Sequence, residues 1–159
     1  GDDADGEALE ALLKGYGVDT SLVTRSERPT RRVMVTLDDE GDRSFACFAG
    51  HQPPEAFADC DYDLSAVEPM ELEAMLRGCR WVACSTLSLA FSQAAHSLSE
   101  LVSDAKDHGA RLCVDVNWRP VFWGAAPGDP RADERASLAR ATIKQLADKA
   151  DIVKLTDGE

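Results

Sequence analysis

Three polar clusters stand directly after short apolar runs, and they carry side chains suited to binding a polyol and a phosphate. They are Ser85-Thr86 with Ser88, Asp115-Val-Asn117-Trp-Arg119, and Thr156-Asp157-Gly158-Glu159. Hydroxyls, carboxylates and an amide can pair with sugar hydroxyls, and the planar guanidinium of Arg119 can hold two oxygens of a phosphate or carboxylate at once. If the apolar runs are neighbouring parallel strands, all three clusters lie along the sheet edge where open α/β sheets bind ligands.

Each cluster also has a purely structural interpretation. Asp and Asn favour turns, so Asp115 and Asn117 could simply shape the chain after their strand, and the two interpretations of this pair stay equally open. Ser85 and Thr86 are better explained as caps of the following helix than as ligand contacts. Glu159 could be a surface acid at a helix start. Their common edge is what favours a functional site.

The elements that would position these clusters follow from the hydrophobic period. The apolar runs 81–84, 112–114 and 152–155 predict short buried strands. Amphipathic stripes predict helices over 91–106 and 132–150. Short strands that do not alternate in polarity, separated by such helices, indicate a doubly wound, mostly parallel α/β sheet covered on both faces.

The amino-terminal half shows a different pattern. Residues 7–14 predict a helix, and 32–37 and 43–48 predict two strands joined by a turn in which Gly41 takes a positive φ. A short helix is expected from Glu68-Pro69 to Gly78. The basic run 28–32 is interpreted as a solvated loop. Because the chain enters on a helix cap and ends directly after a strand, we expect an internal fragment of a larger fold.

Composition narrows the class of protein. The 159 residues are 44% hydrophobic and 29% charged, which suits one α/β domain. A net charge of -12 disfavours binding to nucleic acid or anionic lipid, and no apolar run approaches the ~20 residues that span a bilayer. The five cysteines are odd in number and contain no Cys-x-x-Cys, so we expect buried free thiols in a reducing compartment rather than disulfides or a zinc site.

In this order and spacing, the motifs resemble those of PfkB-family (ribokinase-like) sugar kinases, in particular the fructokinase-like branch. Gly1-Asp-Asp-Ala-Asp-Gly6 resembles the family's Gly-Asp-Asp-x-x-Gly, Gly17-Val-Asp-Thr-Ser21 resembles the turn before the substrate lid, and the hairpin at 30–50 resembles the lid itself. Asp115-Val-Asn-Trp-Arg-Pro-Val-Phe-Trp123 is similar to the signature Asp-x-Asn-x-Arg…Leu-Trp. Residues 150–159 resemble the strand that ends in Asn-x-x-Glu. Thr156 replaces that Asn, which is a departure the fructokinase branch tolerates.

The resemblance implies a ribokinase-like doubly wound sheet with a small β-hairpin lid. All of 1–159 would be part of one such domain, with the lid at 30–50 and a parallel core segment at 80–159. The implied reaction is transfer of the ATP γ-phosphoryl group to a sugar hydroxyl, with ATP and Mg²⁺. Phe48 or its neighbours, Asn117 and Arg119 would bind substrate. Thr156 and Glu159 would organise phosphate and Mg²⁺, with no direct metal ligand in the chain.

Two family elements would lie outside the chain. They are the amino-terminal Gly-Gly segment with its sugar-binding Asp, before Gly1, and the Gly-Ala-Gly-Asp motif with the catalytic base, after Glu159. The isolated chain is therefore expected to be inactive. The implied partners are a sugar and ATP, without nucleic acid or membrane, and a homodimer through the lid is compatible. Cytoplasm or plastid stroma would suit the free thiols.

Two other functions remain open for the full-length protein. One is a catalytically inactive fructokinase-like scaffold subunit of a larger complex, such as a plastid transcription complex. The other is a nucleoside kinase of the same superfamily. The Asp115–Trp123 resemblance favours the sugar branch over the nucleoside branch.

Overall fold

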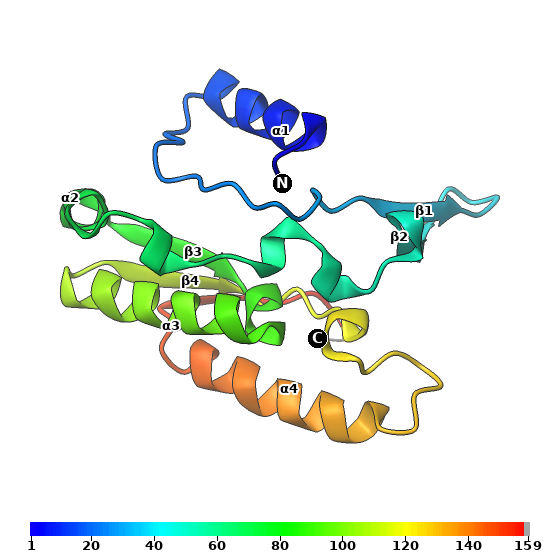
Figure 1. The fold of residues 1–159 in the computed structure, drawn as a ribbon. Helices are drawn as coiled ribbons and strands as arrows, with labels where there is room; N and C mark the ends of the chain where they lie inside the picture. Colours follow the sequence, from blue (N-terminus) through cyan, green and yellow to red (C-terminus); the bar gives the residue numbers. More distant parts are fainter. Residues whose placement is uncertain (158–159) are drawn as a thin grey trace. The chain divides into compact units, whose positions relative to one another are not determined.

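The computed structural model describes residues 1–157 (Figure 1). They form two compact units, 1–61 and 62–157. The first, the amino-terminal unit, contains α1 (Ala4–Gly15), β1 (Val33–Leu37) and β2 (Arg43–Phe48), followed by short 3₁₀ turns. The second, the carboxyl-terminal unit, contains α2 (Pro69–Gly78), β3 (Trp81–Ser85), α3 (Ser92–Asp107), β4 (Arg111–Asp115), α4 (Ala132–Ala147) and β5 (Ile152–Lys154).

The carboxyl-terminal unit is built on a parallel sheet. Among the described residues its strand order is β3-β4-β5, and both pairings are parallel. Ser85 pairs with Asp115, and Asp115 pairs with Lys154, so the three strands end level with one another. The parallel α/β arrangement predicted from the sequence is confirmed.

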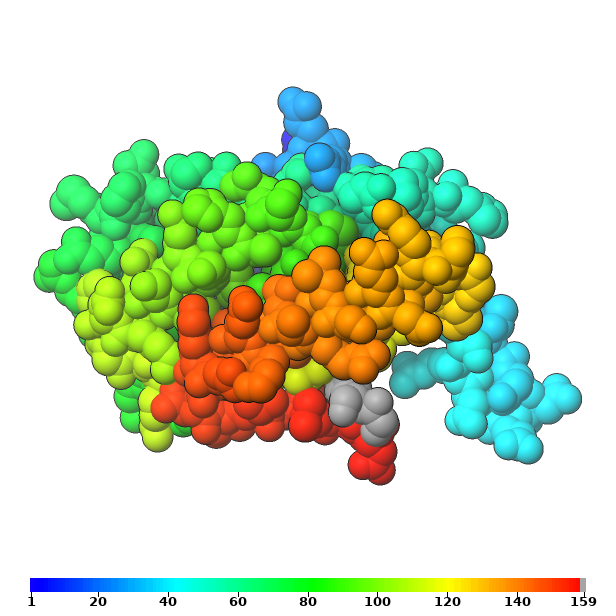
Figure 2. All heavy atoms as spheres, turned by 90° about the horizontal axis from the view of Figure 1, so that it is seen from below, coloured from blue at the N-terminus to red at the C-terminus, as the bar shows by residue number. Residues whose placement is uncertain are grey.

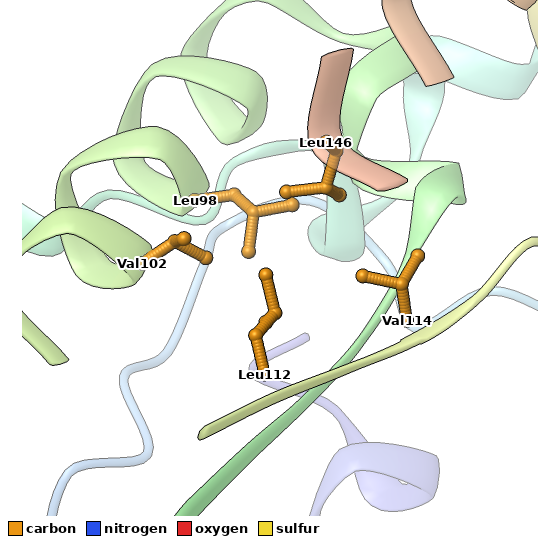
Figure 3. Packing of buried hydrophobic residues seen from close by; sticks show 5 residues of the cluster. All are labelled: Leu98, Val102, Leu112, Val114 and Leu146. Carbon is orange, nitrogen blue, oxygen red and sulfur yellow. The ribbon is translucent and has the colours of Figure 1, made fainter. Parts of the chain in front are cut away.

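Helices α3 and α4 cover the same face of this sheet (Figures 1 and 2). The core beneath them contains Leu98 and Val102 of α3, Leu112 and Val114 of β4, and Leu146 of α4 (Figure 3). The spacing of four residues between Leu98 and Val102 places both side chains on one side of the helix, which is why the predicted stripe packs onto the strand. Thr86 and Ser97 are the buried polar side chains of the described residues.

Helix α4 is shorter than predicted, because it ends at Ala147 and not near residue 150. The reason is that two hydrogen bonds connect the loop after α4 to the start of β4. The Asp151 amide donates to the Leu112 carbonyl at 2.8 Å, and the Leu112 amide donates to Asp151 Oδ2 at 2.7 Å. This backbone bond, with Lys106 nearby, lowers the pKa of Asp151. The chain must leave the helix early to reach this position.

The cysteines are free, as expected, but the expectation of burial is wrong for four of the five. Within the described residues Cys60 is buried, while Cys47, Cys79, Cys84 and Cys113 are half-buried. Leu112 and Val114 face the helices, so Cys113 between them points to the other face of the sheet. Partial burial raises the pKa of the Cys84 thiol to about 11, which keeps it protonated and unreactive.

In the amino-terminal unit, α1 starts earlier than predicted because Asp3 caps it. Asp3 Oδ1 accepts hydrogen bonds from the Gly6 amide at 2.8 Å and the Thr30 hydroxyl at 2.7 Å, and Oδ2 accepts from the Thr30 amide at 2.7 Å. A side chain does not fit at Gly6, since a Cβ there would lie 2.1 Å from the Gly1 carbonyl oxygen. The resembling Gly-Asp-Asp-x-x-Gly stretch therefore has a structural role in this unit.

The predicted hairpin is present. Strands β1 and β2 pair in antiparallel fashion from Val33–Phe48 to Leu37–Arg43, with a bulge between Met34 and Val35. Gly41 has φ 85° at the turn, as predicted.

We expect Asp3→Asn to lower the melting temperature at neutral pH by about 2–4 °C. Its hydrogen bonds to Thr30 and Gly6 hold the pKa of the Asp3 carboxyl well below its ordinary value. The stabilisation is therefore complete above about pH 4 and is lost as the pH falls towards the folded-state pKa. Thermal melts from pH 7 to pH 2 should show the difference between wild type and variant shrinking in acid. Asp2→Asn is the control, and an equal effect of that change would contradict the assignment.

Candidate functional site

The carboxyl ends of the three parallel strands form one polar edge, which we call the carboxyl edge: Ser85, Asp115, Lys154 and the turn at 116–119. Paired residues of neighbouring strands share a face, so the register places Ser85, Asp115 and Lys154 on the face opposite the helices. Lys154 Nζ lies 3.1 Å from both carboxylate oxygens of Asp115. This ion pair fixes the Asp115 carboxylate across the sheet.

The turn after β4 is held from both sides. The Val116 amide donates to the Lys154 carbonyl at 3.0 Å, and the hydroxyl of Thr86 donates to the Val116 carbonyl. Asn117 follows with φ 44°, in the left-handed region that Asn tolerates better than most residues. This conformation is the one that the structural interpretation of Asn117, as a residue that shapes the turn, leads us to expect.

Arg119 comes two residues later and is exposed. Its Nη1 donates to the Trp118 carbonyl at 2.7 Å, which folds the side chain back over its own turn. The short 3₁₀ turn Pro120–Trp123 follows, and the rings of Trp118 and Trp123 lie 6.4 Å apart at 30°. A guanidinium at this edge, beside backbone fixed by two strands, is the group suited to bind a phosphate or carboxylate.

Arg135 of α4 forms hydrogen bonds with the segment that follows this turn. Its Nη1 donates to the Gly124 carbonyl and to Asp129 Oδ2, both at 2.8 Å. Gly124 has φ 61°, and a Cβ there would lie 2.6 Å from the same guanidinium nitrogen. The positive φ favours glycine at position 124, and a side chain there would also displace the Arg135 guanidinium from the Gly124 carbonyl.

The prediction that Ser85 and Thr86 cap the helix at 91–106 is wrong, because the N-cap of α3 is Phe91, which makes no side-chain capping hydrogen bond. Ser85 instead caps the short 3₁₀ turn that comes first. Ser85 Oγ accepts a hydrogen bond from the Leu87 amide at 3.4 Å, at the start of the 3₁₀ turn Thr86–Ala90. Thr86 instead turns inward, with none of its surface exposed, and reaches the neighbouring strand's continuation. Thr156 is exposed in the segment after β5, and Glu159 lies outside the described residues.

Phe48 belongs to the amino-terminal unit and is 3% exposed at the end of β2. Its ring lies 5.5 Å from that of Phe57, and the Arg31 guanidinium stands over both rings, at 4.7 Å and 4.5 Å from their centroids. Next to it is a cavity of about 310 Å³. The residues lining this cavity come from the start of α1 and both ends of the hairpin: Asp3, Ala4, Asp5, Pro29, Thr30, Arg32, Ala49, Gln52 and Phe57.

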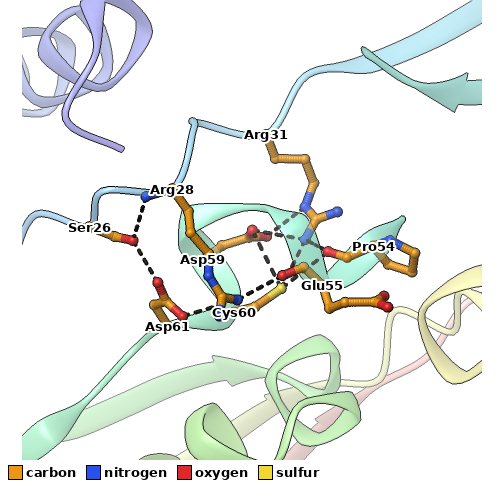
Figure 4. Close-up of polar contacts among 8 residues, drawn as sticks. All are labelled: Ser26, Arg28, Arg31, Pro54, Glu55, Asp59, Cys60 and Asp61. Carbon is orange, nitrogen blue, oxygen red and sulfur yellow. Dashed lines mark hydrogen bonds and ion pairs between the residues drawn. The ribbon is translucent and has the colours of Figure 1, made fainter. Parts of the chain in front are cut away.

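The interpretation of residues 28–32 as a solvated loop is wrong for Arg31. Arg31 Nε and Nη2 donate to the two carboxylate oxygens of Asp59 at 2.8 and 2.9 Å, and Nη2 also donates to the Pro54 carbonyl at 2.7 Å (Figure 4). Arg28 contacts the Glu55 carbonyl and Asp61 in the same way. Both arginines tie the segment that enters the hairpin to the segment that leaves it.

Among residues 1–157, no group of three His, Cys, Asp or Glu side chains is placed to hold a metal ion. No described helix combines the length and the apolar character that crossing a bilayer requires.

Sequence reasoning named Asn117 and Arg119 as candidate site residues, but it did not name Lys154 and did not anticipate that Thr86 points inward. Lys154 could have been found from its place in the sequence, because it ends an apolar strand just as Asp115 ends the neighbouring strand. No feature of the neighbouring sequence indicates the role of Thr86, because its hydrogen-bond partner is 30 residues away in the chain.

Comparison with known proteins identifies one family. The family model described as "pfkB family carbohydrate kinase" matches residues 1–159. A fructokinase of Vibrio alginolyticus is 28% identical over 162 residues, which cover 100% of this chain and 45% of that protein. The chain thus spans less than half the length of this relative.

Two solved structures show the same fold. A fructokinase of Xylella fastidiosa superposes with a TM-score of 0.73 at 24% identity, over 96% of this chain and 41% of that one. An uncharacterised sugar kinase of Pyrococcus horikoshii in complex with ATP gives 0.71 at 20% identity, over 96% and 44%. The ribokinase-like α/β fold expected from the sequence is confirmed.

Proposed function

Because the chain belongs to the pfkB family of carbohydrate kinases, we propose that the full-length protein is a fructokinase-like enzyme that phosphorylates a sugar hydroxyl with ATP. The observation that carries the proposal is the carboxyl edge, where β3, β4 and β5 end level and the Asp115–Arg119 segment follows the central strand. Open α/β sheets bind ligands at this edge. The similarity to fructokinases such as that of Vibrio alginolyticus supports a sugar as the acceptor.

In this proposal Asn117 and Arg119 bind the sugar and the transferred phosphate. The amide of Asn117 can both donate to and accept from sugar hydroxyls, and the guanidinium of Arg119 can neutralise charge on the phosphoryl group. Phosphoryl transfer depends mainly on positioning and charge neutralisation, so these two side chains would contribute to both. Thr156 and Glu159 would help to organise phosphate.

In this proposal the hairpin at 30–50 is the lid and 80–159 is a core segment of the same domain. Phe48 is buried, so contact with the sugar would come from its neighbours, of which Ala49 and Gln52 line the adjacent cavity. A lid excludes water, which would otherwise compete with the sugar as phosphoryl acceptor. The exposed apolar side chains of the hairpin would suit pairing of two lids in a homodimer: Val33, Met34, Val35, Leu37 and Phe45.

ATP would supply the phosphoryl group, and Mg²⁺ would neutralise charge on its phosphates. An ATP-bound neighbour of the same fold supports the choice of nucleotide. We assign neither the general base nor the nucleotide pocket to residues 1–157. Free thiols suit a reducing compartment, such as cytoplasm or plastid stroma.

The test is ATP consumption by the full-length protein against a panel of sugars and nucleosides. We expect turnover with a hexose or keto-sugar, and no turnover by the 159-residue chain alone, because it holds no assigned base. If the protein prefers a nucleoside, the proposed acceptor is wrong and the enzyme is a nucleoside kinase. Absence of turnover with every acceptor, together with co-purification in a large complex, would favour the scaffold function.

A further inference from the structure

We propose that Thr86 is a positioning residue: its hydroxyl fixes the turn that presents Asn117 and Arg119 at the carboxyl edge. The inference deepens the proposed kinase function and rests on it for the role of those two side chains. Thr86 itself is completely buried, so it acts through the turn and not by contact with substrate.

The hydrogen bonds around Val116 carry the inference. On one side the Val116 amide donates to the Lys154 carbonyl at 3.0 Å, and on the other the Thr86 hydroxyl donates to the Val116 carbonyl. Val116 is 6% exposed, so its carbonyl would lose its partner in an apolar setting if the hydroxyl were absent. The peptide groups on both sides of Val116 are thus tied to the continuations of β3 and β5.

The backbone conformation of the next residue, Asn117, explains why the hydrogen bonds of Val116 matter. Asn117 has φ 44°, a conformation that costs energy for any residue with a Cβ and persists where the surroundings impose it. The Val116 carbonyl belongs to the peptide that precedes Asn117, so the Thr86 hydroxyl restrains the rotation of that peptide. Arg119 lies two residues further on, and any rotation there would displace its guanidinium.

The side chain chosen at position 86 fits this function. Threonine fills the buried space with a methyl group while its hydroxyl reaches across to the neighbouring segment. Valine has nearly the same shape without the hydroxyl, and serine keeps the hydroxyl without the methyl group. The pair of substitutions therefore separates the hydrogen bond from packing.

The kinetic experiment compares Thr86→Val and Thr86→Ser in the full-length protein. We expect Thr86→Val to lower kcat/KM for the sugar by about 10- to 100-fold, because small displacements of a positioning group are costly. The KM for ATP should stay within about twofold, and Thr86→Ser should keep most of the activity. Thr142→Val on α4, which removes an exposed hydroxyl that donates to the Leu138 carbonyl, is the matched control.

Hydrogen–deuterium exchange provides a readout that does not depend on activity. Thr86→Val should accelerate exchange of the amides at 117–119 selectively, and Thr86→Ser should not. Unchanged exchange at 117–119 in Thr86→Val would overturn the proposal, as would equal losses of activity and melting temperature in both variants. If the wild-type protein phosphorylates no acceptor, the kinase function fails, and the exchange pattern alone decides whether Thr86 positions the turn.

Discussion

Arg119→Ala in the full-length protein is expected to reduce kcat/KM for sugar phosphorylation by about 100- to 1000-fold. The guanidinium is exposed at the carboxyl edge and can pair with two phosphate oxygens, whereas alanine leaves the developing charge without a partner. The melting temperature should change by no more than about 1 °C, since substitutions of exposed side chains usually change stability little. Steady-state kinetics and thermal melts of the same preparations measure both effects.

Two further variants define what Arg119 contributes. Arg119→Lys keeps the positive charge but loses the planar fork, so we expect an intermediate loss of activity. Arg140→Ala makes the same truncation at an exposed arginine of α4 and should leave the kinetics unchanged. Parallel losses of activity and melting temperature in Arg119→Ala would show instead that Arg119 supports the fold of its turn.

Leu112→Ala is expected to lower the free energy of unfolding by about 3 kcal/mol. Leu112 is 1% exposed and packs in the cluster that joins β4 to α3 and α4. Removing its branched end loses the transfer free energy of the buried atoms and leaves a cavity that these rigid elements cannot close. Because β4 also carries the Asp115–Arg119 segment, activity should disappear at the temperature at which the variant unfolds.

The matched control for this core substitution is Leu138→Ala on α4, where the leucine is 67% exposed. Urea denaturation should show a change within about 0.5 kcal/mol for this variant. A similar small change for Leu112→Ala would mean that the cluster under α3 and α4 does not hold the unit together.

The sequence was sufficient for the elements and for much of the carboxyl edge. A period of 3.6 placed α3 within one residue at each end, and the apolar runs placed β3, β4 and β5. Once alternating strands and helices predict a parallel sheet, its carboxyl ends must share an edge, which is why the Asp115–Arg119 segment could be placed at that edge in advance. The end of α4 was missed because a contact with Leu112, far away in the sequence, decides it.

The amino-acid sequence by itself thus determined the fold class and the position of the Asp115–Arg119 segment after its strand, because the hydrophobic period and the succession of elements along the chain are local properties. Tertiary structure alone decided which polar side chains meet. Asp115 and Lys154 are 39 residues apart, Thr86 and Val116 are 30, and Arg31 and Asp59 are 28. Such pairs follow from strand register and burial in three dimensions, and no spacing along the chain encodes them.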